Sequence, residues 1–146
     1  MTTLTHSGDE TKKIAAEFAT SLRGGEFIAL VGELGSGKTT FVQGLAAALG
    51  STAKVKSPTF TIMDIYPANH PHIKQIVHVD FYRVPTAHDD IALEEYKRTD
   101  TIIVAEWPTD RDRKNCSVAV VFDYGKGENE RLITIQTPRG KLLRRM

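Results

Sequence analysis

The sequence predicts a single small α/β domain in which helices flank a mixed β-sheet, and three observations support this fold class. Near-continuous apolar runs at 26–32 and 101–107 are typical of strands that are covered on both faces. Segments with helical periodicity lie on either side of the first run, at 7–22 and 38–50. The chain has 146 residues, about 40% of them hydrophobic, which suits one buried core. We therefore expect one domain over 1–146, with a basic tail at 139–146.

The first third of the chain is expected to fold as helix, strand and helix. Ser7 and Glu10 have the spacing of a capping box before a first helix, whose apolar face comprises Ile14, Ala15, Phe18, Ala19 and Leu22. Gly24 and Gly25 end this helix before the strand at 26–32. A second helix follows at 38–50, with Gly50 placed as a C-terminal stop.

The rest of the chain is expected to complete the sheet. Apolar residues on both sides of the turn-rich segment 67–72 predict two strands paired through a loop. A short helix is expected at 89–96, and the second buried strand at 101–107. The segment 117–137 predicts two strands around a Gly-rich turn, at an antiparallel edge of the sheet. The charged segment 109–115 matches no pattern and is interpreted as a solvated loop.

Composition indicates the expected cellular compartment and argues against a stand-alone nucleic-acid-binding protein. Cys116 is the single cysteine, and no apolar run approaches the roughly 18 residues that span a bilayer, so we expect a cytoplasmic protein with no membrane contact. The last eight residues carry four basic and no acidic side chains, so the rest of the chain is net negative. Such a body is a poor stand-alone binder of nucleic acid, because that binding depends on Lys and Arg.

The strongest motif is Gly32-Glu33-Leu34-Gly35-Ser36-Gly37-Lys38-Thr39, which fits the phosphate-loop pattern G-x-x-x-x-G-K-[ST] between a strand and a helix. Glycines allow backbone N–H groups to turn toward an anion, and the helix start favours the same phosphates. Lys38 is expected to bridge β- and γ-phosphates, and Thr39 to offer a hydroxyl to Mg²⁺. The expected fold is therefore P-loop NTPase-like. The absence of a guanine-reading element at the required spacing favours ATP.

Acidic residues at two strand ends are candidates to complete this site. Glu106 ends the strand at 101–107 and suits a metal ion, whereas Asp80 ends the strand after the 67–72 turn. The alternative for Glu106 is a solvent-facing acid. For Asp80 it is an antiparallel strand, with His78 as a purely structural hydrogen-bond partner. Thr59, after Pro58, is a candidate switch residue that contacts Mg²⁺ or the γ-phosphate, or else part of an ordinary loop.

Five segments in this order and at these separations resemble the TsaE (YjeE) family. They are "GELGSGKTTFVQGL", "VKSPTFT", "HVDFYR", "ALEEY" and "VAEWP", and the match runs from about Ser7 to Pro108. The phosphate loop is shared by a large superfamily, but the runs around Thr59, Asp80 and Trp107 together are specific to this family.

The resemblance implies a small Mg²⁺-dependent ATPase that acts with the TsaB–TsaD heterodimer in making threonylcarbamoyladenosine at position 37 of tRNAs that read codons beginning with A. Such an ATPase resets the complex rather than performing the transfer, and meets tRNA only indirectly. The implied catalytic or metal residues are Thr59, Asp80 and Glu106, with Thr39 as a further Mg²⁺ ligand. Trp107 and Arg83 are further functional candidates, and the implied nucleotide-binding residues are Glu33, Leu34, Gly35, Ser36, Gly37, Lys38, Thr39 and Thr40.

Two other functions stay open at this point. A small nucleotide or metabolite kinase opens with the same loop, but needs an arginine-bearing lid, for which only Arg111 and Arg113 are available. The second is a nucleotide-sensing module that binds ATP without turnover.

In the sequence, no arginine lies next to the phosphate loop, and Arg83 alone falls within a matched motif near a site acid. We therefore expect slow hydrolysis that a partner accelerates.

Overall fold

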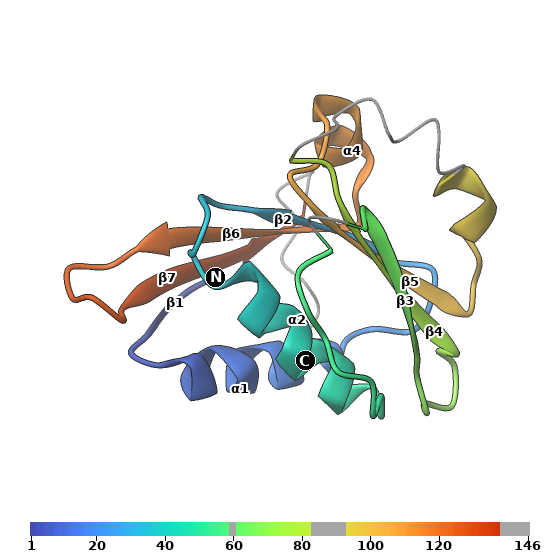
Figure 1. Ribbon diagram of the computed structural model, residues 1–146, viewed down its shortest axis with the longest axis horizontal. Helices are drawn as coiled ribbons and strands as arrows, with labels where there is room; N and C mark the ends of the chain where they lie inside the picture. The colour runs from blue at the N-terminus through green and yellow to red at the C-terminus, as the bar shows by residue number, and fades with distance from the viewer. Residues whose placement is uncertain (59–60, 83–92, 138–146) are drawn as a thin grey trace.

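The computed structural model describes residues 1–58, 61–82 and 93–137, and the strands of this part form one seven-stranded mixed sheet (Figure 1). Its order is β1-β7-β6-β2-β5-β4-β3. The strands are β1 (Thr2–Thr5), β2 (Phe27–Val31), β3 (Met63–Pro67), β4 (Gln75–Asp80), β5 (Thr101–Glu106), β6 (Val118–Tyr124) and β7 (Arg131–Gln136). Strands β6, β2, β5 and β4 run parallel, while β3, β7 and β1 add antiparallel pairs at the two sides. The mixed α/β fold predicted from the sequence is confirmed.

Helices cover both faces of the sheet. Helices α1 (Gly8–Ala19) and α2 (Lys38–Ala48) pack side by side on one face, while the 3₁₀ turn η1 (Leu93–Tyr96) and α4 (Asp110–Asn115) lie toward the other (Figure 1). Because side chains alternate along a strand, Ile28 and Leu30 of β2 join the cluster under α1 and α2, whereas Phe27 and Ala29 join the opposite cluster. Strand β2 is therefore buried on both faces, as its apolar run predicts.

The two large helices approach closely at Gly44. A Cβ added there would lie 2.6 Å from both Cα and the carbonyl oxygen of Lys12 in α1. Glycine at this position therefore allows α2 to pack directly against the backbone of α1.

Helices α1 and α2 begin where predicted, but α1 ends at Ala19 with Thr20 as its C-cap, earlier than the stop predicted at Gly24 and Gly25. Ser7 caps α1 by accepting a hydrogen bond from the Glu10 amide at 3.2 Å, but the Glu10 carboxylate binds the amide of His6, not that of Ser7. Half of the predicted capping box is thus formed. After α2, Gly50 adopts a positive φ of 80°, which confirms its role as the stop.

Three predictions about the second half need correction or lie partly outside the described residues. The pair β6–β7 is antiparallel as expected, but it is not the edge of the sheet, because β1 pairs with the outer side of β7 and β6 pairs with β2. Residues 110–115 form α4 rather than a loop, with a full capping box between Thr109 and Asp112. Of the helix expected at 89–96, the described part is the 3₁₀ turn η1.

No helix in the described ranges is long and apolar enough to cross a membrane.

Candidate nucleotide-binding site

The phosphate loop connects the carboxyl end of β2 to the first turn of α2, as predicted. Gly35 and Gly37 have positive φ values of 74° and 107°, which only glycine adopts readily. Gly37 is the N-cap of α2 and provides no side-chain hydrogen bond, so the first amides of this helix are not capped by a side chain. A Cβ built on Gly37 meets nothing within 4 Å. The loop therefore borders open space beside a helix N-terminus, which favours an anion.

Lys38 is buried at the base of this loop. Its Nζ donates a hydrogen bond to the Gly32 carbonyl at 2.6 Å and lies 4.1 Å from the centre of the Trp107 ring, and the residue is 5% exposed. Burial lowers the pKa of Lys38 below its ordinary value, although Glu106, Asp80 and Glu33 favour the charged form. The ammonium group thus interacts electrostatically with the acids, and phosphate oxygens can replace its hydrogen bond to the Gly32 carbonyl.

The two candidate acids lie next to each other at the same edge of the sheet. Strands β4 and β5 run parallel and pair Asp80 with Glu106, while β2 and β5 pair Leu30 with Glu106. The antiparallel alternative for the Asp80 strand is therefore wrong. Both acids are buried and line the cavity beside the loop, so the solvent-facing alternative for Glu106 is also wrong. Asp80 Oδ1 accepts a hydrogen bond from the Tyr82 amide at 2.8 Å.

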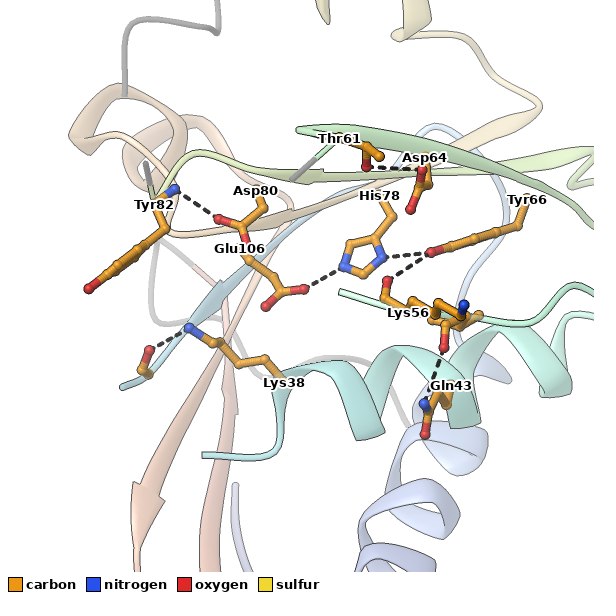
Figure 2. Close-up of polar contacts among 12 residues, drawn as sticks. Lys38, Gln43, Lys56, Thr61, Asp64, Tyr66, His78, Asp80, Tyr82 and Glu106 are labelled. Carbon is orange, nitrogen blue, oxygen red and sulfur yellow. Dashed lines mark hydrogen bonds and ion pairs between the residues drawn. The ribbon is translucent and has the colours of Figure 1, made fainter. Parts of the chain in front are cut away.

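Glu106 ends a chain of hydrogen bonds between buried polar groups that do not line the cavity (Figure 2). Glu106 Oε2 lies 2.5 Å from His78 Nε2, and His78 Nδ1 lies 3.1 Å from the Tyr66 hydroxyl. The Tyr66 hydroxyl in turn lies 3.2 Å from the carbonyl oxygen of Lys56. Burial raises the pKa of Tyr66 to about 12. The sequence offered His78 as a hydrogen-bond partner but gave no sign that Tyr66 and Lys56 extend the chain.

Trp107 follows Glu106 in a conformation that is unusual for a bulky residue. Its φ is 52°, in the left-handed region, and its ring lies 4.7 Å from that of Tyr82 in an edge-to-face contact. This backbone turn places the indole over Lys38 and on the wall of the cavity. Trp107 therefore lines the cavity, and backbone strain of this kind clusters at functional sites.

A cavity of about 390 Å³ joins these groups and extends to the other side of the loop. Strands β5 and β6 lie on opposite sides of β2. Asp80 and Glu106 therefore line the end of the cavity on the β5 side, and a second set of residues lines the end on the β6 side. This second set comes from the start of α1 and from the β6–β7 hairpin, and comprises Ser7, Gly8, Thr11, Asn129 and Arg131. Sequence reasoning missed all five as site residues.

Arg131 corrects the expectation that no arginine lies beside the phosphate loop. Its Nη2 donates to the Gly35 carbonyl at 3.2 Å, and its guanidinium lies 4.9 Å from the centre of the Tyr124 ring. The Tyr124 hydroxyl donates to the Leu34 carbonyl at 2.5 Å. Arg131 is 96 residues from Gly35 along the chain, so no local motif indicates the contact.

The other predicted residues divide into three groups. Leu34, Gly35, Gly37, Lys38, Thr39 and Thr40 line the cavity, while Glu33 and Ser36 belong to the loop without lining it. Thr59 and Arg83 lie outside the described residues.

The residues present fit a nucleotide and a hard cation. The Ser36 hydroxyl is buried without a hydrogen-bond partner in the described part of the chain, which is an unusual state for a polar atom. Thr39, Asp80 and Glu106 supply oxygen donors, the kind that Mg²⁺ prefers. No cluster of three or more His, Cys, Asp or Glu side chains suited to a metal occurs in the ranges described. The three oxygen-bearing side chains at the cavity suit a cation that takes its other ligands from phosphate and water.

Comparison with known proteins identifies the family and the fold of this chain. The family model described as threonylcarbamoyl adenosine biosynthesis protein TsaE matches residues 5–133. The tRNA threonylcarbamoyladenosine biosynthesis protein TsaE of Aquifex aeolicus is 38% identical over 131 residues, which are 88% of this chain and 90% of that protein. The protein of the same name in Bacillus subtilis is 39% identical over 99 residues, 68% of this chain and 61% of that protein. This alignment therefore spans less than two thirds of the Bacillus relative.

A solved structure shares the fold. The crystal structure of Bacillus subtilis YdiB superimposes with a TM-score of 0.74 at 31% identity, over 92% of this chain and 83% of that one.

Proposed function

The chain belongs to the TsaE family of threonylcarbamoyl adenosine biosynthesis proteins, and from this premise we propose that it binds ATP with Mg²⁺ and hydrolyses it. One observation carries the proposal. A complete phosphate loop, a buried lysine and two carboxylates at the ends of adjacent parallel strands line a single cavity. This combination provides both phosphate binding and the acids that P-loop enzymes use for metal and water.

The two ends of the cavity favour one orientation of the nucleotide. With the phosphates in the loop, the γ-phosphate faces Asp80 and Glu106, and the nucleoside extends toward Asn129 and Arg131 on the β6 side. Arg131 donates a hydrogen bond to the Gly35 carbonyl of the loop and is therefore a candidate to contact the ribose or base. The opposite orientation would bring the negative γ-phosphate away from Lys38 and the metal acids.

Each residue at the γ-phosphate end has a proposed role. Lys38 would exchange its hydrogen bond with Gly32 for phosphate oxygens. Thr39 and Glu106 would hold Mg²⁺, which would neutralise charge on the phosphates. Asp80 orients the attacking water. Trp107 keeps solvent from one side of the Lys38 ammonium. Thr59 as a switch residue and Arg83 as a second positive charge stay predictions.

We further propose that this ATPase serves tRNA threonylcarbamoyladenosine synthesis, acting on the TsaB–TsaD heterodimer and meeting tRNA only through that complex. Exposed apolar side chains around the loop support docking of a protein there. Leu34 is 59% exposed, Tyr124 51% and Tyr82 42%, and they lie on both sides of the phosphate site. A docked partner would cover them and close the cavity from solvent.

The rate of phosphate release, with and without partner, tests the function. Among the described residues Arg131 lies on the β6 side, so Lys38 is the cation that faces the acids. Enzymes of this class that lack a second positive charge at the γ-phosphate are slower by about 10³- to 10⁵-fold. We expect slow release from the chain alone and a large acceleration by TsaB–TsaD. Equal rates would refute the reset function, and transfer of labelled phosphate to a nucleoside acceptor would indicate a kinase instead.

A further inference from the structure

The hydrogen-bonded chain that starts at Glu106 reaches Lys56, in a segment that is distant from Glu106 in the sequence. Glu106 ends β5, His78 lies within β4, Tyr66 within β3, and Lys56 belongs to the connection between α2 and β3. His78 is fully buried, and Tyr66 is 5% exposed. The hydrogen bonds Glu106–His78–Tyr66–Lys56 thus join three neighbouring strands on the face of the sheet that α1 and α2 cover (Figure 2).

The connection between α2 and β3, to which Lys56 belongs, makes further hydrogen bonds to neighbouring elements. On its α2 side, Gln43 Nε2 donates to the Val55 carbonyl at 3.2 Å, next to Lys56. On its β4 side, the Asp80 amide donates to the Ile62 carbonyl at 2.8 Å, and the Ile62 amide donates to the Pro58 carbonyl at 2.6 Å. Ser57, within the same connection, lines the cavity. Both acids of the site are therefore linked to this connection, each by a separate route.

His78 and Tyr66 do not line the cavity, so any effect that they have on a ligand must pass through residues that do. A carboxylate on a flexible side chain has several rotamers, and a hydrogen bond of 2.5 Å to a buried ring selects one of them. Partners of this kind behind a metal-binding carboxylate typically change metal affinity by 10- to 100-fold when removed, in order-of-magnitude terms. Fully satisfied buried networks also hold the groups that they join in one arrangement, because breaking any link leaves a buried polar atom unpaired.

We propose that His78 and Tyr66 are positioning residues that orient the Glu106 carboxylate for Mg²⁺ and couple it to the backbone at Lys56, so that the 55–58 segment responds when Mg²⁺ and nucleotide bind. The proposal rests on the proposed function, since it assumes that Glu106 is a metal ligand. It differs from a purely structural role for His78, which would affect stability and all ligands alike.

The single tryptophan of the chain, Trp107, provides the readout, because it follows Glu106 and covers Lys38. Mg²⁺ is titrated into the protein saturated with a non-hydrolysable ATP analogue while tryptophan fluorescence is recorded. Affinity for the analogue without Mg²⁺ is measured separately. We expect His78→Asn, whose amide reaches the Nδ1 position but not Glu106, to raise the Mg²⁺ midpoint by about 10- to 100-fold. We expect His78→Gln, whose amide reaches the Nε2 position, to restore most of that affinity.

Tyr66→Phe tests the coupling, because it removes one hydroxyl and keeps the ring. We expect a Mg²⁺ midpoint between those of the two His78 variants. In the wild-type protein, amide hydrogen exchange at 55–57 should slow when Mg²⁺ is added to the nucleotide complex, and in Tyr66→Phe this response should be lost. Thermal unfolding of each variant establishes that it is folded at the assay temperature.

The outcomes separate this inference from the proposed function. If the wild-type protein shows no Mg²⁺-dependent response with nucleotide, the ATPase proposal fails and the positioning role fails with it. If the wild type responds but His78→Asn keeps the wild-type Mg²⁺ midpoint, the positioning role alone is refuted. An equal loss of nucleotide affinity with and without Mg²⁺ also refutes it, because that pattern indicates a structural role.

Discussion

Replacing Lys38 by methionine should separate nucleotide binding from folding stability. Methionine keeps most of the length and apolar volume of the lysine side chain and removes its charge. In the wild-type protein this charge is buried, 2.6 Å from the Gly32 carbonyl and 4.1 Å from the centre of the Trp107 ring. We expect the free energy of unfolding to change little and the affinity for ATP to fall steeply.

The magnitudes follow from the contacts of the ammonium group. Folding loses one charge-assisted hydrogen bond, about 1.5–3 kcal/mol, and one cation–π contact, about 0.5–2 kcal/mol. It also avoids burying an ammonium ion, an effective penalty of several kcal/mol. These terms are similar in size and opposite in sign, so the net change should be within about 1 kcal/mol. Binding loses the contacts to phosphate, about 3 kcal/mol, which corresponds to about 10²-fold in affinity or rate.

The assay pairs two measurements on the same protein. Urea unfolding gives the free energy of unfolding, and calorimetric titration with ATP and Mg²⁺ gives the affinity. Lys13→Met is the matched control, because Lys13 is an exposed lysine on α1. Wild-type affinity in Lys38→Met would refute the assignment of the phosphate site. A large loss of stability together with the loss of binding would show that Lys38 is mainly a structural residue.

Three further predictions test other parts of the molecule. Glu106→Gln should raise the Mg²⁺ concentration needed for half-maximal hydrolysis, whereas Asp80→Asn should slow hydrolysis more than it weakens binding; the reverse pattern in a Mg²⁺ titration would exchange their roles. Gly44→Ala should lower the free energy of unfolding by about 1–3 kcal/mol, because its Cβ would meet the Lys12 backbone, although helix propensity alone predicts a gain; a higher Tm would refute the close packing of α1 on α2. The pKa of Tyr66 is about 12 in the folded protein and about 10 in the unfolded chain. Tyr66 therefore contributes stability that is fully present below about pH 10 and is lost as the pH rises through about 12. In an absorbance titration, the tyrosinate step at high pH should be absent in Tyr66→Phe.

Residues close together in the chain made the core of the site predictable. The glycines of the phosphate loop, Lys38 and the start of α2 form one continuous segment, and their conformations follow from local rules for glycine and helix ends. The positions of Asp80 and Glu106 were also predictable, on the condition that their strands run parallel to β2. Burial of apolar runs on both faces favours that arrangement, and the register of β4 with β5 meets the condition.

One local signal in the sequence indicates the short helix α4. The Thr109-x-x-Asp112 spacing is that of a capping box, and it begins α4 in the segment interpreted as a loop. Helix α4 is too short and too highly charged to show the apolar periodicity on which the other helix predictions depend.

The amino-acid pattern was sufficient for the α/β class, the phosphate loop, the order of the main elements and the pair of strand-end acids, because each depends on local periodicity, turn residues or strand direction. Tertiary structure alone decided that β1 forms the edge beside β7, that Arg131 reaches the Gly35 carbonyl, and that His78 and Tyr66 link Glu106 to Lys56. These contacts join residues far apart in the chain, and no local pattern specifies them. They depend on how the strands and helices pack on the two faces of the sheet, which sets the partner of each buried polar group.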